Sequence, residues 1–140
     1  MAQVSVTRRY RFCAAHRLHT DYLTPEDNWA AFGKCNNPNG HGHNYVVLVT
    51  VKGSHGQQSY HLERLDRVVE ETIVKRFDHQ DLNQDGAFSG STTTGENLVK
   101  LIWELLFDKV PAGSLEKVGV IETRDNYFEY AGPAVSHGRT

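Results

Sequence analysis

Residues 35–44 read Cys-Asn-Asn-Pro-Asn-Gly-His-Gly-His-Asn and lead directly into Tyr-Val-Val-Leu-Val-Thr-Val at residues 45–51. The second stretch is rich in β-branched residues and predicts a strand that begins near His41. Because successive side chains of a strand point to opposite faces, His41 and His43 share one face. Two imidazoles on one face can bind the same metal ion. These residues therefore predict a strand that carries part of a metal site at its start.

The N-terminal segment has the alternation of a half-buried strand, and it ends in a further histidine. One parity holds Val4, Val6, Tyr10, Phe12, Ala14 and His16, and the other holds Ser5, Thr7, Arg9 and Arg11. His16 is therefore expected on the apolar side, at the C-terminal end of this strand. Three neutral histidines (His16, His41 and His43) suit zinc and leave its fourth position for water or substrate, as in a catalytic site.

Two other interpretations of these histidines stay open. They can be ordinary polar residues near strand ends, or Cys35 can join them in a closed structural zinc shell. The length of the chain argues against the structural shell, because 140 residues can bury a core without a metal to hold it together.

The composition indicates one globular domain that spans residues 1–140. Hydrophobic residues make up 39% of the chain and charged residues 23%, without the bias of a disordered sequence. No stretch has the length of a membrane span, and the first residues lack the apolar core of a secretion signal. The net charge of −2, with no basic stretch interleaved with aromatics, disfavours nucleic acid as a partner. The two cysteines, Cys13 and Cys35, are too few for a disulfide scaffold and fit a reducing cytoplasm.

The middle of the chain predicts two helices. Apolar residues at helical spacing predict the first from about Leu62 to Arg76, and a polar loop follows over residues 84–92. Thr93 and Glu96 match a capping box, with Thr93 as the N-cap. The second helix starts there and stops before Pro111.

Two short strands close the chain, over residues 117–125 and 127–130, with Asp125-Asn126 as the hairpin turn. The order β-β-α-α-β-β predicts an α+β fold, an antiparallel sheet with both helices on one face. The other sheet face still carries Tyr, Val and Leu side chains. Their burial calls for the association of several copies of the chain.

Further side chains could take part in proton transfer. Asp78-His79 follows the first helix, and a carboxylate beside an imidazole can orient it as a proton acceptor, although such a pair is also common at helix ends. A zinc ion near Cys35 would favour its thiolate as a base or nucleophile. Cys13, inside a strand, is expected to be a buried and inert thiol.

Glu122 is unusual because it shares the parity of Val118 and Val120 in the third strand. A buried carboxylate needs a partner, which could be a salt bridge or a ligand with paired N–H donors. Glu96 has a local explanation as a capping residue.

Together these residues resemble the 6-pyruvoyl-tetrahydropterin synthase family, which includes 6-carboxytetrahydropterin synthase. The matching motifs cover nearly the whole chain and are residues 12–18, 33–45, 78–79, 94–97 and 121–123. The resemblance implies a tunnelling fold, in which trimers close a barrel and two trimers stack into a homohexamer. It also implies 7,8-dihydroneopterin triphosphate as the substrate and active sites between subunits.

The resemblance assigns a role to each candidate residue by its position. His16, His41 and His43 are similar to the family's zinc ligands, and Cys35 to its general base, with Asp78 and His79 completing a catalytic triad across a subunit boundary. Glu122 is similar to the anchor for the amino-pyrimidine edge of the pterin, with Thr94 and Glu96 nearby. The implied enzyme is a zinc-dependent carbon–oxygen lyase that eliminates triphosphate without nicotinamide or flavin.

Three positions depart from the family pattern. Gly95 stands where Ser or Thr is common, His61 where Asn or Asp precedes the first helix, and Cys13 where a smaller residue is found.

One alternative to the pyruvoyl-type enzyme is 6-carboxytetrahydropterin synthase of deazapurine (queuosine) biosynthesis, which shares its substrate, zinc and base. Another is a non-catalytic pterin-binding or structural-zinc protein on the same fold. The length of the segment between Cys35 and His41 favours the pyruvoyl type.

Overall fold

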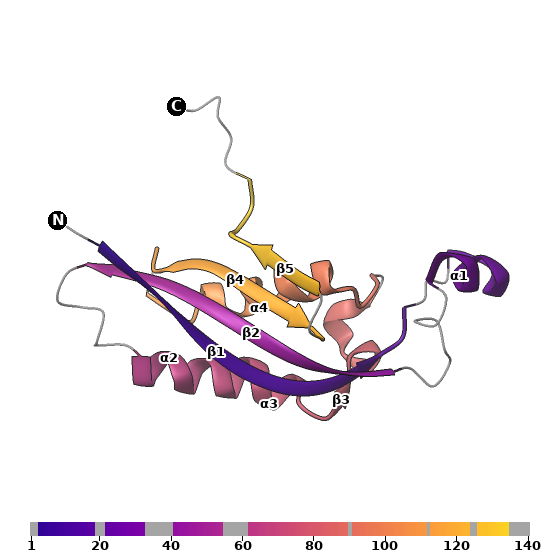
Figure 1. Ribbon diagram of the computed structural model, residues 1–140, viewed down its shortest axis with the longest axis horizontal. Helices are drawn as coiled ribbons and strands as arrows, with labels where there is room; N and C mark the ends of the chain where they lie inside the picture. Colours follow the sequence, from indigo (N-terminus) through magenta and orange to yellow (C-terminus); the bar gives the residue numbers. More distant parts are fainter. Residues whose placement is uncertain are drawn as a thin grey trace.

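Two long antiparallel strands, β1 (Gln3–His16) and β2 (His41–Ser54), form the backbone of the fold (Figure 1). Their register is continuous from Gln3 opposite Ser54 to His16 opposite His41. The predicted first and second strands are thus confirmed. The register also brings two of the three predicted metal-ligand positions opposite one another.

This computed structural model describes residues 3–18, 22–32, 41–54, 62–89, 91–111, 113–123 and 126–134. Of Gln3, Phe32, His41, Gly53 and Ser54, only the main chain is described. Three positions singled out in the sequence, Cys35, His61 and Asp125, lie outside the described residues.

The sheet has five strands in the order β3-β1-β2-β4-β5. The C-terminal strands are β4 (Leu115–Glu122) and β5 (Asn126–Tyr130), close to the predicted ranges. The short strand β3 (Gln80–Asp81) was not predicted, and it pairs parallel to β1 at Ala14 and Ala15. The sheet is therefore mixed, and the expectation of a purely antiparallel sheet is wrong at this edge.

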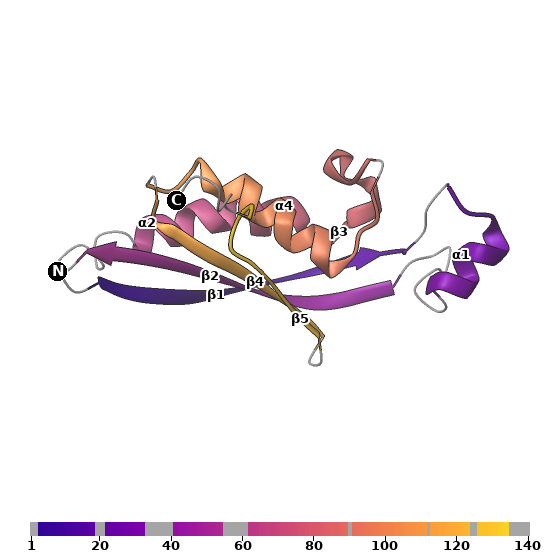
Figure 2. The same cartoon turned by 90° about the horizontal axis from the view of Figure 1, so that it is seen from above.

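The two predicted helices cover one face of the sheet, as Figure 2 shows. The first is continuous and consists of α2 (Leu62–Val69), a π-helical segment η3 (Glu70–Val74) and α3 (Lys75–Phe77). The second is α4 (Gly95–Phe107). Apolar side chains of both helices pack on the sheet in one core, among them Leu65, Val69, Ile73, Phe77, Leu98, Ile102 and Leu106.

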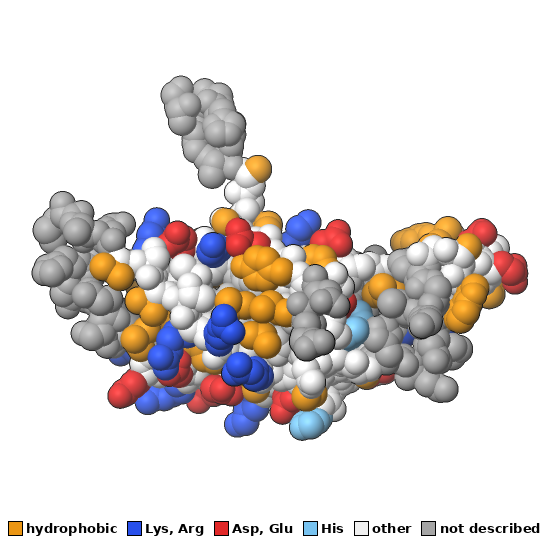
Figure 3. Space-filling model, in the orientation of Figure 1, with side chains coloured by type: hydrophobic (Ala, Val, Ile, Leu, Met, Phe, Trp, Pro, Cys, Tyr) orange, Lys and Arg blue, Asp and Glu red, His pale blue; other side chains and the backbone are white. Residues whose placement is uncertain are grey.

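Alternation along the strands separates a buried face from an open one. Tyr10, Phe12 and Ala14 of β1 lie buried under the helices, as their shared parity predicted. The open face carries Arg9, Arg11 and Cys13, and apolar side chains gather on it beside lysines and arginines (Figure 3). Cys13 is exposed, so the expectation of a buried thiol is wrong. Its odd position in β1 places it on the face that no helix covers.

A short helix that the sequence analysis did not predict, α1 (Pro25–Phe32), lies beyond the end of the sheet (Figures 1 and 2). The signal for it was present, because Thr24 precedes a proline at the first helical position and two acidic residues follow. The Thr24 hydroxyl accepts a hydrogen bond from the Asp27 N–H. Within the described residues, no helix combines the length and the apolar composition that crossing a bilayer requires.

The predicted polar loop after the first helix has structure of its own. It contains two 3₁₀ turns, η4 (Leu82–Gln84) and η5 (Gly86–Phe88), and Leu82 and Phe88 are buried beneath them. Between the turns, Asp85 accepts a hydrogen bond from the Ala87 N–H and two from the Arg76 guanidinium, at 2.8 and 2.9 Å. This carboxylate thus joins the loop to the end of the first helix.

We expect Asp85→Asn to destabilise the protein at neutral pH and to have little effect in acid. Arg76 and the Ala87 N–H hold the pKa of the Asp85 carboxyl below its ordinary value of 3.8. A lowered folded-state pKa adds stability above that value, and this stability is lost as the pH falls through the folded pKa. The expected loss at pH 7 is about 1 kcal/mol, because the partly exposed Arg76 side chain is screened by water.

The measurement is urea unfolding at fixed protein concentration from pH 7 down to pH 3. Asp108→Asn, at the exposed C-terminal end of α4, serves as the control. A difference between Asp85→Asn and wild type that stays constant over this range would contradict the assignment.

Candidate functional site

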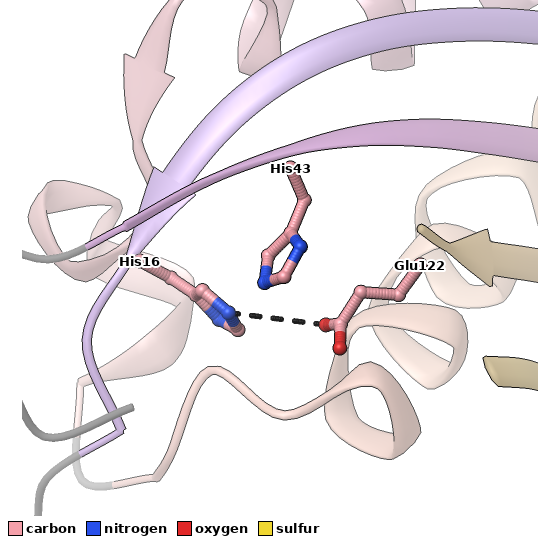
Figure 4. Close-up of side chains that lie close together, drawn as sticks. All are labelled: His16, His43 and Glu122. Carbon is pink, nitrogen blue, oxygen red and sulfur yellow. Dashed lines mark ion pairs between the residues drawn. The ribbon is translucent and has the colours of Figure 1, made fainter. Parts of the chain in front are cut away.

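Three side chains from three neighbouring strands converge at one end of the sheet: His16, His43 and Glu122 (Figure 4). They come from the end of β1, the start of β2 and the end of β4. Their ligand atoms all lie within 4.8 Å of one another. All three side chains lie on the sheet face that the helices cover, as strand parity predicted.

His16 is held in one orientation by a main-chain carbonyl. Its side chain is 1% exposed, and its Nδ1 lies 2.7 Å from the carbonyl oxygen of Thr93. Because a carbonyl oxygen can only accept, Nδ1 carries the proton and donates it. Nε2 then presents its lone pair on the other side of the ring, 3.8 Å from Oε2 of Glu122.

This arrangement fits a divalent metal ion. A neutral Nε2 and a carboxylate oxygen are both electron-rich, and either a bound cation or a proton on Nε2 turns their repulsion into attraction. Imidazole nitrogens and carboxylate oxygens are ligands that zinc takes, and a ligand histidine commonly donates its other N–H to a carbonyl. The group is therefore a possible metal-binding site, and the contact of its ligand His16 with the Thr93 carbonyl is already formed.

Of the predicted third histidine ligand, His41, the structure describes only the main chain. The main chain of His41 pairs with that of His16, at the same end of the sheet. Its side chain lies outside the described part of the chain. Glu122 occupies the third position of the observed group instead, and strand parity had singled it out as a buried carboxylate.

Glu122 has a second neighbour in Tyr45. The Tyr45 hydroxyl donates to Oε2 of Glu122 at 3.5 Å, the long limit of a hydrogen bond. Burial and the Glu122 carboxylate raise the pKa of Tyr45 far above its usual range. Tyr45 therefore stays protonated and serves only as a donor to the carboxylate.

The start of α4 differs from the prediction by one residue. The N-cap is Thr94, whose hydroxyl accepts the Asn97 N–H at 3.2 Å, so the predicted capping box of Thr93 with Glu96 is wrong. The reason is that Thr93 is buried, its carbonyl binds His16, and its hydroxyl donates to the Arg17 carbonyl. Thr93 thereby belongs to the segment that packs on β1, and exposed Glu96 takes no part in the cap.

Asp78 and His79 lie apart from the three-residue group, beside β1. The Cys13 main chain holds both residues, because its N–H donates to Oδ1 of Asp78 and its carbonyl accepts the His79 N–H. Oδ2 of Asp78 lies 3.6 Å from Nε2 of His79, whose side chain is 81% exposed. His79 has a φ of 59°, so it turns the chain from α3 into β3.

A pocket of about 500 Å³ opens beside this pair. His79 lines it together with Cys13, Ala14, Ala15, Gly42, His43, Asn44, Gln80 and Asp81. It joins the exposed imidazole to the start of β2, where the predicted metal ligands lie.

The structure explains the glycine at position 95. A Cβ at this position would lie less than 3.0 Å from three ring atoms of Phe128 in β5. Ser or Thr therefore does not fit here unless the Phe128 ring moves. The missing hydroxyl is thus linked to an aromatic ring that fills its place.

Comparison with known proteins finds a matching family model, similar sequences and a similar structure. The family model described as 6-pyruvoyl tetrahydropterin synthase matches residues 5–133. The human 6-pyruvoyl tetrahydrobiopterin synthase is 43% identical over 134 residues, which is 93% of this chain and 92% of that protein. The Drosophila melanogaster enzyme of the same name is 38% identical over 138 residues, covering 95% and 82% of the two chains. The structure of Caenorhabditis elegans 6-pyruvoyl tetrahydropterin synthase superposes with a TM-score of 0.88 at 36% identity, covering 95% of this chain and 98% of that one.

Proposed function

The chain belongs to the 6-pyruvoyl tetrahydropterin synthase family, and on that premise we propose that it is a zinc-dependent lyase acting on 7,8-dihydroneopterin triphosphate. Its function is of the 6-pyruvoyl tetrahydropterin synthase type, and the reaction class is that of a lyase. The observation that carries the zinc proposal is the convergence of His16, His43 and Glu122 at the end of the sheet. We further propose one domain over residues 1–140, acting in the cytoplasm.

The proposed zinc ligands are His16, His41 and His43. Bound zinc would supply a Lewis acid for the hydroxyl groups of the substrate side chain. His16 supports this role because its Nδ1–H is held by Thr93 and its Nε2 is directed into the group. The pairing of the His16 and His41 main chains supports His41 as a further ligand.

The proposed proton-transfer groups are Cys35, Asp78 and His79. The Cys35 thiolate would take the proton from the substrate side chain, and the elimination of triphosphate would follow. Asp78, fixed by the Cys13 N–H, would orient the His79 imidazole. His79 is too exposed in one chain to act in a buried site, so we propose that it serves the site of a neighbouring subunit.

Several features support an assembly in which subunits share sites. Within the described residues, β3 pairs with β1 only at Ala14 and Ala15. The rest of this edge of β1 can therefore accept another strand. The open face carries apolar side chains, including Tyr127 with 51% exposure. Joining such edges closes a barrel and buries that face. We propose trimers that form barrels and stack into a homohexamer.

The proposed anchor of the pterin is Glu122, with Thr94 and Glu96 nearby. A carboxylate can accept two parallel N–H donors from an amino-pyrimidine edge. Tyr45 supports this role by donating to one carboxylate oxygen. The Thr94 hydroxyl accepts the Asn97 N–H, and its own O–H would be donated to the substrate.

Cys35→Ala is expected to abolish turnover and to leave zinc in place. The thiolate is the proposed base, so its loss removes proton transfer while the histidines still bind the metal. The measurement is mass analysis of the product from 7,8-dihydroneopterin triphosphate, with zinc content measured in parallel on wild type and variant.

The product and the zinc content separate the alternatives. A pyruvoyl-tetrahydropterin product made by wild type supports the proposal, and a carboxy-tetrahydropterin product would assign the chain to the deazapurine (queuosine) branch. A wild type without turnover, together with zinc loss from Cys35→Ala, would favour a non-catalytic structural-zinc protein.

Hybrids of Cys35→Ala and His79→Ala subunits are expected to regain activity that neither variant has alone. In a random 1:1 assembly, about a quarter of the sites combine an intact Cys35 with an intact His79 from a neighbour. The measurement is the turnover of co-expressed, differently tagged subunits purified through both tags. Hybrids as inactive as their parents would contradict sites shared between subunits.

Glu122→Gln tests whether this carboxylate holds the pterin or the metal. If Glu122 anchors the pterin, removing its charge raises KM at least tenfold, because a charge-assisted pair of hydrogen bonds is worth about 1.5–3 kcal/mol. Zinc content then stays at the wild-type level. A variant that loses zinc in proportion to its activity would instead make Glu122 a metal ligand.

A further inference from the structure

The segment from Thr92 to Asn97 forms a hydrogen-bonded turn directly against His16. Thr93, the second residue of this segment, is 1% exposed, and its carbonyl is the acceptor for the His16 Nδ1–H. The Thr93 hydroxyl donates to the carbonyl of Arg17, the residue after His16. Thr93 thus contacts the end of β1 through both its main chain and its side chain.

Asn97 holds the two residues on either side of Thr93, which are Thr92 and Thr94. Its side-chain amide donates to the Thr92 carbonyl at 2.9 Å and to the Thr92 hydroxyl at 3.3 Å. Its main-chain N–H donates to the Thr94 hydroxyl at 3.2 Å. Asn97 itself sits in the first turn of α4, so this turn is anchored to a helix that packs on the core.

We propose that Asn97 is a positioning residue for the metal site, because it holds the Thr93 carbonyl where that carbonyl fixes the His16 tautomer. The side chain of Asn97 hydrogen-bonds to Thr92 and not to a residue of the candidate metal group. It acts through the Thr92–Thr93 peptide unit, then through the Thr93 carbonyl, and finally through the His16 ring. The inference rests on the proposed metal at His16.

The physical effect is a choice between two neutral forms of His16. When Nδ1 carries the proton, Nε2 has its lone pair directed toward Glu122 and is ready to bind a metal. If the Thr93 carbonyl moves away, the proton can occupy Nε2 instead, and that form cannot bind a metal through this atom. Loss of such outer contacts commonly lowers metal affinity by about 10- to 100-fold.

Asn97→Asp is the variant of choice because it keeps the shape of the side chain and removes its donors. A carboxylate is favourable in the first turn of a helix, so this variant is expected to fold. Its oxygens repel the Thr92 carbonyl and release the turn. Val99→Ala is the matched control, since it removes methyl groups buried beneath the same helix and leaves the turn's hydrogen bonds in place.

Two measurements are made on each protein. NMR of ¹⁵N-labelled histidine rings in the metal-free protein reports the tautomer of His16, with His16→Gln used for assignment. Competition with a chelator reports the dissociation constant for zinc. We expect wild type and Val99→Ala to carry the His16 proton on Nδ1. Asn97→Asp is expected to show a mixture of tautomers and a zinc dissociation constant about tenfold higher.

The outcomes separate this inference from the function on which it rests. Asn97→Asp with the wild-type tautomer and zinc affinity would overturn the inference alone. A wild type that binds no zinc would overturn the proposed metal site and the inference together. A Val99→Ala protein that weakens zinc binding as much as Asn97→Asp would assign the effect to general destabilisation and overturn the positioning role.

Discussion

The register between β1 and β2 is the constraint on which the rest of the structure depends. The two strands pair without interruption from one end to the other, and they place His16 opposite His41 and Ala14 opposite His43. A shift by one residue would turn every side chain of a strand to the other face. It would expose the apolar row of β1 and move His16 away from His43. The hydrophobic pattern that forms the core therefore also assembles the candidate metal group of His16, His43 and Glu122.

The core and the site occupy the same face of the sheet, and this imposes a demand on polar atoms. His16 lies in the same row as Tyr10, Phe12 and Ala14, where a polar ring without partners would be costly. The Thr93 carbonyl provides one partner, and the Glu122 carboxylate faces the other ring nitrogen. The apolar surroundings keep water away from these atoms and strengthen each interaction between them. Burial thus gives the group both its geometry and its affinity for positive charge.

Strand parity explains why much of the fold and part of the site could be predicted. Alternation places His16 and Glu122 on the buried face without any knowledge of their partners, and helical spacing gives both helices. The start of α4 could not be predicted in this way, because Thr93 and Thr94 are equally good caps. The choice between them is made by His16, which comes from a distant part of the chain and takes the Thr93 carbonyl. The exposure of Cys13 follows from its odd parity, and the short parallel strand β3 has too few residues for a pattern.

The contrast between the surroundings of His16 and His79 fits the different roles proposed for them. One imidazole is buried with a fixed proton and a carboxylate facing it, which suits a ligand that must not move. The other is held only through its main chain, with its ring exposed beside a pocket at the sheet edge. An exposed ring can exchange protons but cannot exclude water, so it needs a second surface to complete its environment. The open edge of β1 and the apolar open face offer such a surface to another copy of the chain. The proposed assembly would therefore bring the exposed His79 ring of one chain to the candidate metal group that another chain has already formed.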